Sequence, residues 1–251
     1  MGEKTGIVWC DHTFNCWIGC QKVSDGCKNC YAARDNERYH WVEKWGEDYH
    51  RTSAANWEKP IQWAKQAVKE GVIRRAFCAS LADVFDMNVP YEWKLSLYSL
   101  ISSTGHIGGL EWLILTKRPE NILGTFPKKW IDNPPDFIRM GVTAENQIMV
   151  NRRIPELLNS WSGKNFVSVE PMLSPIDITD FIEKINWIIC GCESGPNSRT
   201  TKHDWARDLR DQCIDSDVPF FLKQLMIDNK KVVLPSLDGR VWYEFPKEKD
   251  G

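Results

Sequence analysis

The sequence predicts an α/β protein built as a partial or full barrel of about six to seven βα units. Short apolar, β-branched runs alternate with longer helical patterns along the chain, and a polar segment follows almost every apolar run. The length of 251 residues suits one such barrel, so we expect a single domain over residues 1–251. In this architecture the carboxyl ends of the strands meet at one edge, where ligands bind.

The predicted strands are short apolar segments bounded by polar or turn-forming residues. The first is expected near Ile7–Thr13, and the others at Arg75–Ala79, Glu111–Thr116, Phe137–Val142, Asn165–Val169, Asn186–Cys190 and Pro219–Leu222. Helical patterns lie between them at Ala54–Glu70, Pro90–Ser102, Gln147–Leu158 and His203–Cys213, with a basic turn that opens at Asn121.

Two segments lie outside this alternation. Leu237–Arg240 carries an Asp-Gly pair between apolar stretches, which predicts a β-hairpin within a C-terminal cap over residues 227–251. Residues 39–63 are rich in Trp, Glu, Lys and His without clear periodicity at their start. We expect this segment to be an insertion that covers the mouth of the barrel.

Composition excludes several classes of protein. Lys and Arg number 32 against 34 Asp and Glu, a formal charge of −2, so no global basic field indicates nucleic acid. Hydrophobic content of 42% with 26% charged residues is typical of a globular chain and excludes disorder. The longest apolar runs, such as Trp112–Leu115, are far shorter than the ~20 residues that cross a bilayer. Met1–Cys10 lacks the pattern of an export signal, so a cytoplasmic location is expected.

The chain has nine cysteines, and five of them fall within Cys10–Cys30. Without an export signal, such a cluster indicates metal or redox chemistry rather than disulfides. Cys20, Cys27 and Cys30 form C-x6-C-x2-C, and a glycine precedes each of the first two, which suits a loop wrapped closely around a metal. We expect this cluster loop to span residues 16–32.

The spacing leaves three interpretations open. The first is a structural zinc site, which needs four ligands. Cys20, Cys27 and Cys30 supply three of them, and Cys16, His12 or His40 can supply the fourth. A [4Fe–4S] cluster held by three cysteines leaves one iron open for a substrate or cofactor. The third interpretation is a set of free thiols. Because the loop follows the first strand of a barrel, it is expected at the catalytic edge, which favours a catalytic cluster.

The segment around these cysteines resembles a phage-associated family of uncharacterised proteins with radical S-adenosylmethionine (SAM) character. The residues that match the N-terminal motif of this family are Trp9, Asp11, Thr13, Asn15, Gly19, Cys20, Ser24, Gly26, Cys27, Asn29, Cys30, Tyr31 and Ala32. Similar later blocks begin at Leu115 (LTKRP), Gly141 (GVTAEN), Ser168 (SVEPML), Glu193 (ESGP), Phe221 (FLKQ) and Leu237 (LDGR), so the resemblance covers nearly the whole chain.

The resemblance implies a radical SAM-like barrel in which Cys20, Cys27 and Cys30 hold a [4Fe–4S] cluster that binds SAM. Cys16 and Cys192 stand where the family usually has Pro and Gly, so neither is an expected ligand. The expected cofactor-binding residues lie at strand ends, and they are Ser80, Asp83, Thr116, Lys117, Thr143, Glu145, Ser168, Glu170 and Glu193. Among them, Ser80 and Asp83 are expected near the SAM amino group, and Ser168 and Glu170 near its ribose hydroxyls. Lys117 or Arg118 is expected to meet the SAM carboxylate or a substrate phosphate.

The resemblance also implies partners: SAM itself and an electron donor of the flavodoxin or ferredoxin type. Phage association, a Trp-rich insert and a set of basic residues favour a nucleobase or nucleic-acid substrate, and a peptide or small metabolite is the competing substrate class. The basic residues are Lys117, Arg118, Lys128, Lys129, Arg152 and Arg153. The alternative from another class is a non-catalytic, zinc-stabilised module that binds nucleic acid or a protein.

Overall fold

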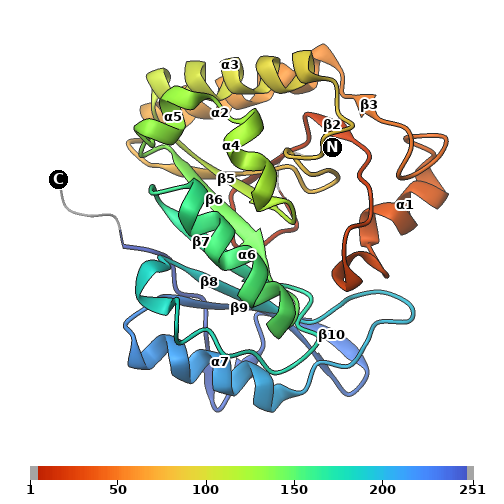
Figure 1. The fold of residues 1–251 in the computed structure, drawn as a ribbon, viewed down its shortest axis with the longest axis vertical. Coiled ribbons are helices and arrows are strands. Elements are labelled where there is room, and N and C mark those ends of the chain that lie inside the picture. The colour runs from red at the N-terminus through yellow and green to blue at the C-terminus, as the bar shows by residue number, and fades with distance from the viewer. Residues whose placement is uncertain (1–4, 248–251) are drawn as a thin grey trace.

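The structure, a computed structural model, describes residues 5–247. Its centre is an eight-stranded sheet that curls into a half-barrel (Figure 1). The strands, in spatial order, are β1 (His12–Phe14), β4 (Arg74–Cys78), β5 (Leu110–Thr116), β6 (Ile138–Thr143), β7 (Asn165–Val169), β8 (Ile188–Gly191), β9 (Phe220–Ile227) and β10 (Lys230–Val233). All neighbours up to β9 are parallel, and β10 returns antiparallel to β9. The predicted fold class is confirmed, with seven parallel strands.

The helices cover the outer face of the sheet, except α1, which lies apart from them on the open side (Figure 1). They are α1 (Tyr31–Tyr39), α2 (Ala54–Glu70), α3 (Tyr91–Ile107), α4 (Ile122–Thr125), α5 (Lys128–Asp132), α6 (Gln147–Ser160) and α7 (His203–Asp215). Short 3-10 turns lie at η1 (Asp25–Cys27), η2 (Pro119–Asn121) and η3 (Ile182–Lys184). None of the described helices is long and apolar enough to cross a membrane.

Helix boundaries follow local chemistry. The 17-residue helix α2 ends at Gly71, whose φ of 68° is left-handed and lets its amide bond back to the carbonyls of Ala67 and Val68. Helix α6 begins after Asn146, whose side chain accepts a 3.0 Å hydrogen bond from the amide of Met149. The observed bounds of α2 agree with those predicted from sequence, and α6 extends two residues further.

Alternating side chains divide the core into two layers, as the twofold period of a strand requires. In β5, Trp112 and Ile114 pack outward against the helices, whereas Leu113 points into the half-barrel. In β9, Phe220 and Phe221 divide in the same way. Both faces of the central sheet are therefore covered, and strands β5 to β8 are almost continuously buried.

The inner layer explains why the first strand is shorter than predicted. β1 covers only His12–Phe14, because the preceding residues leave the sheet and enter the half-barrel. The ring of Trp9 lies 4.6 Å from that of Phe77 and 6.2 Å from that of Phe166, centroid to centroid. Gly141 of β6 makes room for this layer, because a Cβ there would lie 2.3 Å from the Phe166 ring.

The remaining strands form two small ribbons. β11 (Ser236–Leu237) pairs with β12 (Arg240–Val241) across Asp238 and Gly239, whose φ angles of 54° and 82° suit the predicted Asp-Gly hairpin. The part of the predicted cap beyond residue 247, like residues 1–4 of the predicted domain, lies outside the described residues. β2 (Trp17–Ile18) pairs with β3 (His50–Arg51).

The predicted lid at residues 39–63 contains two kinds of structure. From residue 54 onward the chain forms α2, which packs with α3 on the outside of the sheet. The part before β3 lies near the mouth, where Trp45 lines the central cavity.

Candidate functional site

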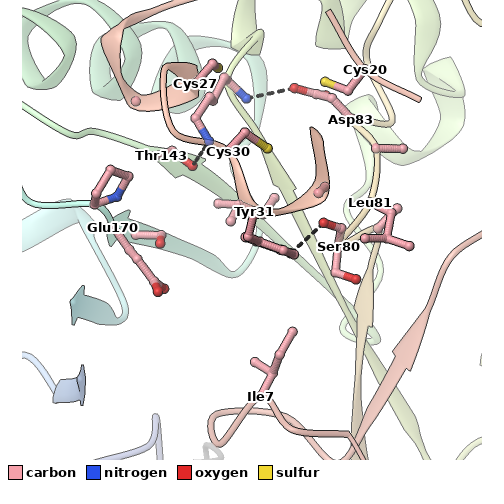
Figure 2. Close-up of a pocket in the computed structure, with 18 of the residues that line it drawn as sticks. Ile7, Cys20, Cys27, Cys30, Tyr31, Ser80, Leu81, Asp83, Thr143 and Glu170 are labelled. Atoms are coloured by element: carbon pink, nitrogen blue, oxygen red, sulfur yellow. Dashed lines mark hydrogen bonds between the residues drawn. The ribbon is translucent and has the colours of Figure 1, made fainter. Parts of the chain in front are cut away.

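A cavity opens at the carboxyl ends of the parallel strands (Figure 2). The space open to the centres of water-sized spheres is about 180 Å³, and all the space between atoms, including the open mouth, is about 1090 Å³. Eleven of the twelve predicted site residues line it, all except Glu145. Its lining combines the apolar side chains of Ile7, Trp9, Phe77 and Leu115 with polar residues from the strand ends.

The cluster loop crosses one side of this cavity. It enters at Gly19, whose φ is 120° and where a Cβ would lie 2.4 Å from the carbonyl oxygen of Asp48, so only glycine fits. It ends where α1 begins at Tyr31. Cys20, Cys27 and Cys30 all line the cavity (Figure 2). Within residues 5–247, no three His, Cys, Asp or Glu side chains are gathered closely enough to hold a single metal ion.

Cys20 lies beside a buried charge network. Arg118, which follows β5, directs its guanidinium to the Cys20 Sγ at 3.7 Å, the Gln21 carbonyl at 2.9 Å and the carboxylates of Asp83 and Asp86 at 3.0 and 3.1 Å. Asp86 also accepts the Gln21 amide at 3.1 Å. Burial raises the pKa of the Cys20 thiol to about 12; nearby Asp83 adds to the rise and Arg118 opposes it.

A second hydrogen-bond network holds Gly26, the residue before Cys27. The Gly26 amide donates to Glu145 Oε1 at 3.2 Å, and Glu145 Oε2 accepts from Arg153 of α6 at 2.7 Å. A Cβ on Gly26 would lie 2.9 Å from the Glu145 carboxyl carbon, so the close approach needs glycine. Burial is the largest single influence and disfavours the ionised form of Glu145, but Arg153, Ser24 and Lys117 together outweigh it and hold the pKa of Glu145 below its usual range. Glu145 is fully buried behind the loop, which is why it does not reach the cavity.

A third network joins Asn29, the residue before Cys30, to the segment that follows β8. The side-chain amide of Asn29 donates to Glu193 Oε2 at 2.8 Å and to the Asn197 carbonyl at 2.9 Å. Glu193 is ion-paired with Arg199, which also donates to the Asp25 carbonyl at 2.9 Å. Burial opposes ionisation of Glu193, but the bonds from Arg199 and Asn29 keep its pKa below the usual range.

Several predicted cofactor contacts already have protein partners. Both oxygens of Asp83 are engaged: Oδ1 accepts from Thr116 at 2.7 Å and Oδ2 from the Lys117 amide at 3.0 Å as well as from Arg118. Ser80 pairs with Asn15 at 3.0 Å. The Lys117 ammonium donates to Thr143 at 3.3 Å and forms no ion pair with a carboxylate in the described part of the chain.

The cavity also contains groups that were not among the predicted site residues. Lys223 of β9 is ion-paired with Glu170, which follows β7, and Cys192 lies near this pair. Burial, followed by the charge of Glu170, raises the pKa of the Cys192 thiol to about 11. The Tyr31 hydroxyl donates to the Ser80 carbonyl from the first turn of α1 (Figure 2). Two features of the sequence could have indicated these residues. Lys223 follows an apolar strand segment, and Tyr31 comes directly after Cys30.

The zinc ligands proposed beyond the three cysteines lie elsewhere. Cys16 is buried with its Sγ 4.0 Å from that of Cys78, and His12 stacks on Trp63. Cys16, His12 and His40 are all absent from the residues that line the cavity. The four-ligand zinc sets predicted from spacing are therefore not brought together.

The predicted basic residues do not form one phosphate-binding surface. Arg118 and Arg153 are buried in ion pairs with acidic partners, which leaves them unavailable to a polyanion. Arg152 pairs with Glu120 and Lys128 with Asp132 on the surface. Only Lys117 and Arg118 of this set line the cavity.

Comparisons with known proteins identify a family and a fold. A family model described as "Protein of unknown function (DUF5131)" matches residues 4–246. Among solved structures, a cysteine-to-alanine mutant of spore photoproduct lyase with dinucleoside spore photoproduct is similar at 10% identity and a TM-score of 0.52. A tyrosine-to-phenylalanine mutant of spore photoproduct lyase is similar at 7% identity and a TM-score of 0.51. Each alignment covers 85% of this chain and 76% of the other. No curated protein matches.

Proposed function

This chain belongs to the DUF5131 family, and we propose that it is a radical SAM enzyme that binds a [4Fe–4S] cluster through Cys20, Cys27 and Cys30. The observation that carries this proposal is the placement of the three cysteines. They come from one short loop, and all three face a cavity at the carboxyl edge of a parallel half-barrel, the edge where such folds place their ligands.

The donor set fits a cluster better than a single ion. Thiolates on one zinc lie about 3.8 Å apart, given Zn–S bonds of about 2.3 Å, and a group of that kind is absent from residues 5–247. A four-iron cluster is larger and holds its cysteines further apart, and three protein ligands leave one iron open. When bound, the cluster supplies the electron that cleaves SAM and yields a 5′-deoxyadenosyl radical able to abstract hydrogen from a substrate.

The cavity residues then divide into those that bind SAM and those that hold the SAM-binding residues in position. Lys117 is the candidate for the SAM carboxylate, because its ammonium reaches the cavity and has only the Thr143 hydroxyl as a partner among the described residues. Ser168 lines the cavity and can bond to a ribose hydroxyl. Asp83 and Thr116 are engaged with each other and with the Lys117–Arg118 backbone, so they fix the position of Lys117.

The substrate is proposed to be a nucleobase or nucleic acid. The apolar part of the cavity lining includes the flat rings of Trp9 and Phe77. The Glu170–Lys223 pair on the wall supplies an acceptor and a donor for the edge of such a ring. The fold is also similar to that of a lyase solved with a dinucleoside photoproduct, which supports this substrate class.

The test is anaerobic purification with iron, sulfide and zinc analysis, followed by incubation with dithionite and SAM and detection of 5′-deoxyadenosine. We expect about four irons per chain and formation of 5′-deoxyadenosine. Cys27→Ala should remove both. The matched control is Cys16→Ala, a buried cysteine outside the cavity, which should keep both.

One zinc per chain, without iron or SAM cleavage, would overturn the proposal in favour of the zinc-stabilised binding module. Lys117→Met separates binding from cluster assembly. It should retain iron while weakening SAM binding about tenfold or more, since a charge-assisted hydrogen bond is lost.

A further inference from the structure

Three buried carboxylates reach the cluster loop, and each binds the residue next to one of the three cysteines. Asp86 accepts the backbone amide of Gln21, which follows Cys20. Glu145 accepts the amide of Gly26, which precedes Cys27. Glu193 accepts the side-chain amide of Asn29, which precedes Cys30. The three carboxylates follow three different strands, β4, β6 and β8.

Each of these carboxylates is fixed by its own arginine. Arg118 pairs with Asp86, Arg153 with Glu145 and Arg199 with Glu193. Two of the arginines also hold the loop backbone directly, since Arg118 donates to the Gln21 carbonyl and Arg199 to the Asp25 carbonyl, both at 2.9 Å. Arg118 reaches the Cys20 sulfur as well.

We infer that these three arginine–carboxylate pairs form a clamp that sets the positions of the three cysteines before any cluster binds. Glu145 and Glu193 are thereby positioning residues that act through Gly26 and Asn29, not contacts to SAM. The clamp rests on the proposed function in one respect only, which is that the group held by the loop is an iron–sulfur cluster.

The physical reason for such a clamp is conformational entropy. Between Gly19 and Tyr31 the loop has one 3-10 turn and no strand, so its own backbone hydrogen bonds cannot fix it. Bonds from three strand ends fix it during folding instead. The entropy is then lost when the protein folds and not when the cluster binds, which strengthens cluster binding.

The arm at Asn29 is the best one to test, because this side chain is partly exposed and its loss leaves the core intact. Asn29→Ala removes the bonds to Glu193 and to the Asn197 carbonyl, and Asn29→Asp places a second carboxylate against Glu193. Lys28→Ala is the matched control, because Lys28 is the exposed neighbour.

Two measurements are made on the protein as purified under anaerobic conditions. The first is amide hydrogen exchange in peptides that cover residues 19–32. The second is the rate of iron loss to an added chelator. For Asn29→Ala and Asn29→Asp we expect both rates to rise about tenfold or more, as for the loss of one bond to a charged group. Lys28→Ala should match the unchanged protein.

Loop exchange rates in both Asn29 variants equal to those of Lys28→Ala would overturn the clamp, whatever the metal content. If the unchanged protein contains no iron, the proposed function fails, and the exchange measurement still decides the clamp.

Discussion

Replacing Arg153 by methionine tests whether Glu145 is held as a buried anion. The Glu145 side chain is 0% exposed and that of Arg153 3% exposed, and their closest N–O distance is 2.7 Å. After Arg153→Met the carboxylate keeps the Gly26 amide but has lost its ion-pair partner. Removing one member of a buried pair typically costs about 3–5 kcal/mol, and we expect a loss of that size in the free energy of unfolding.

The neighbouring residue supplies the control. The Arg152 side chain is 63% exposed and lies 3.6 Å from Glu120, so Arg152→Met should change stability by less than about 1 kcal/mol. The assay is urea unfolding at pH 7, followed by tryptophan fluorescence. Adding Glu145→Gln to Arg153→Met removes the buried charge, so the double variant should be more stable than the sum of the single losses by about 2–3 kcal/mol.

Equal effects of the Arg153 and Arg152 substitutions would refute this reasoning, because a buried pair and an exposed pair would then contribute alike. Additive losses in the double variant would refute the direct coupling of Glu145 with Arg153.

Two further predictions concern pH and packing. The pKa of Glu145 is lowered in the folded protein, so its ionised form stabilises the fold above the usual carboxyl value near 4.5, and this contribution is lost as pH falls through the lowered value. The stability advantage of the unchanged protein over Glu145→Gln, measured by urea unfolding, should therefore shrink between pH 7 and pH 3; a constant difference would contradict it. Gly141→Ala should cost about 1–3 kcal/mol, because its Cβ would overlap the Phe166 ring. Phe166→Leu in the same chain should recover part of that loss, and an unchanged midpoint for Gly141→Ala alone would show that the inner layer is loosely packed.

Local patterns predicted much of the fold because their signals lie within single segments. The strand Asn165–Val169 and the helix Ala54–Glu70 have the bounds that apolar runs and flanking turn residues indicate. The first strand was predicted to start at Ile7, since an apolar run at a strand position does not show that Trp9 inserts between Phe77 and Phe166. That placement depends on residues far along the chain.

The site was predictable as a set but not in its division of roles. Strand-end polar residues were expected together, and all of the predicted site residues except Glu145 line the cavity. Glu145 and Arg153 looked like a cofactor contact and a phosphate contact, respectively. Their pairing with each other, and the bond from Glu145 to Gly26 across 119 positions, depend on tertiary structure that no local pattern encodes.

The separation in sequence between the cluster loop and its anchors has a consequence for biosynthesis. Asn29 and Glu193 are 164 positions apart, and Asp25 and Arg199 are 174 apart. At roughly 5–20 residues per second, a ribosome needs about 9–35 s to travel from the last cysteine of the loop to the final anchor. During that interval the nascent chain carries all three thiols in a loop that lacks its third arm. The proposed clamp is therefore completed only late in synthesis, and a chain that stalls before Arg199 has the three cysteines without the full support of their loop.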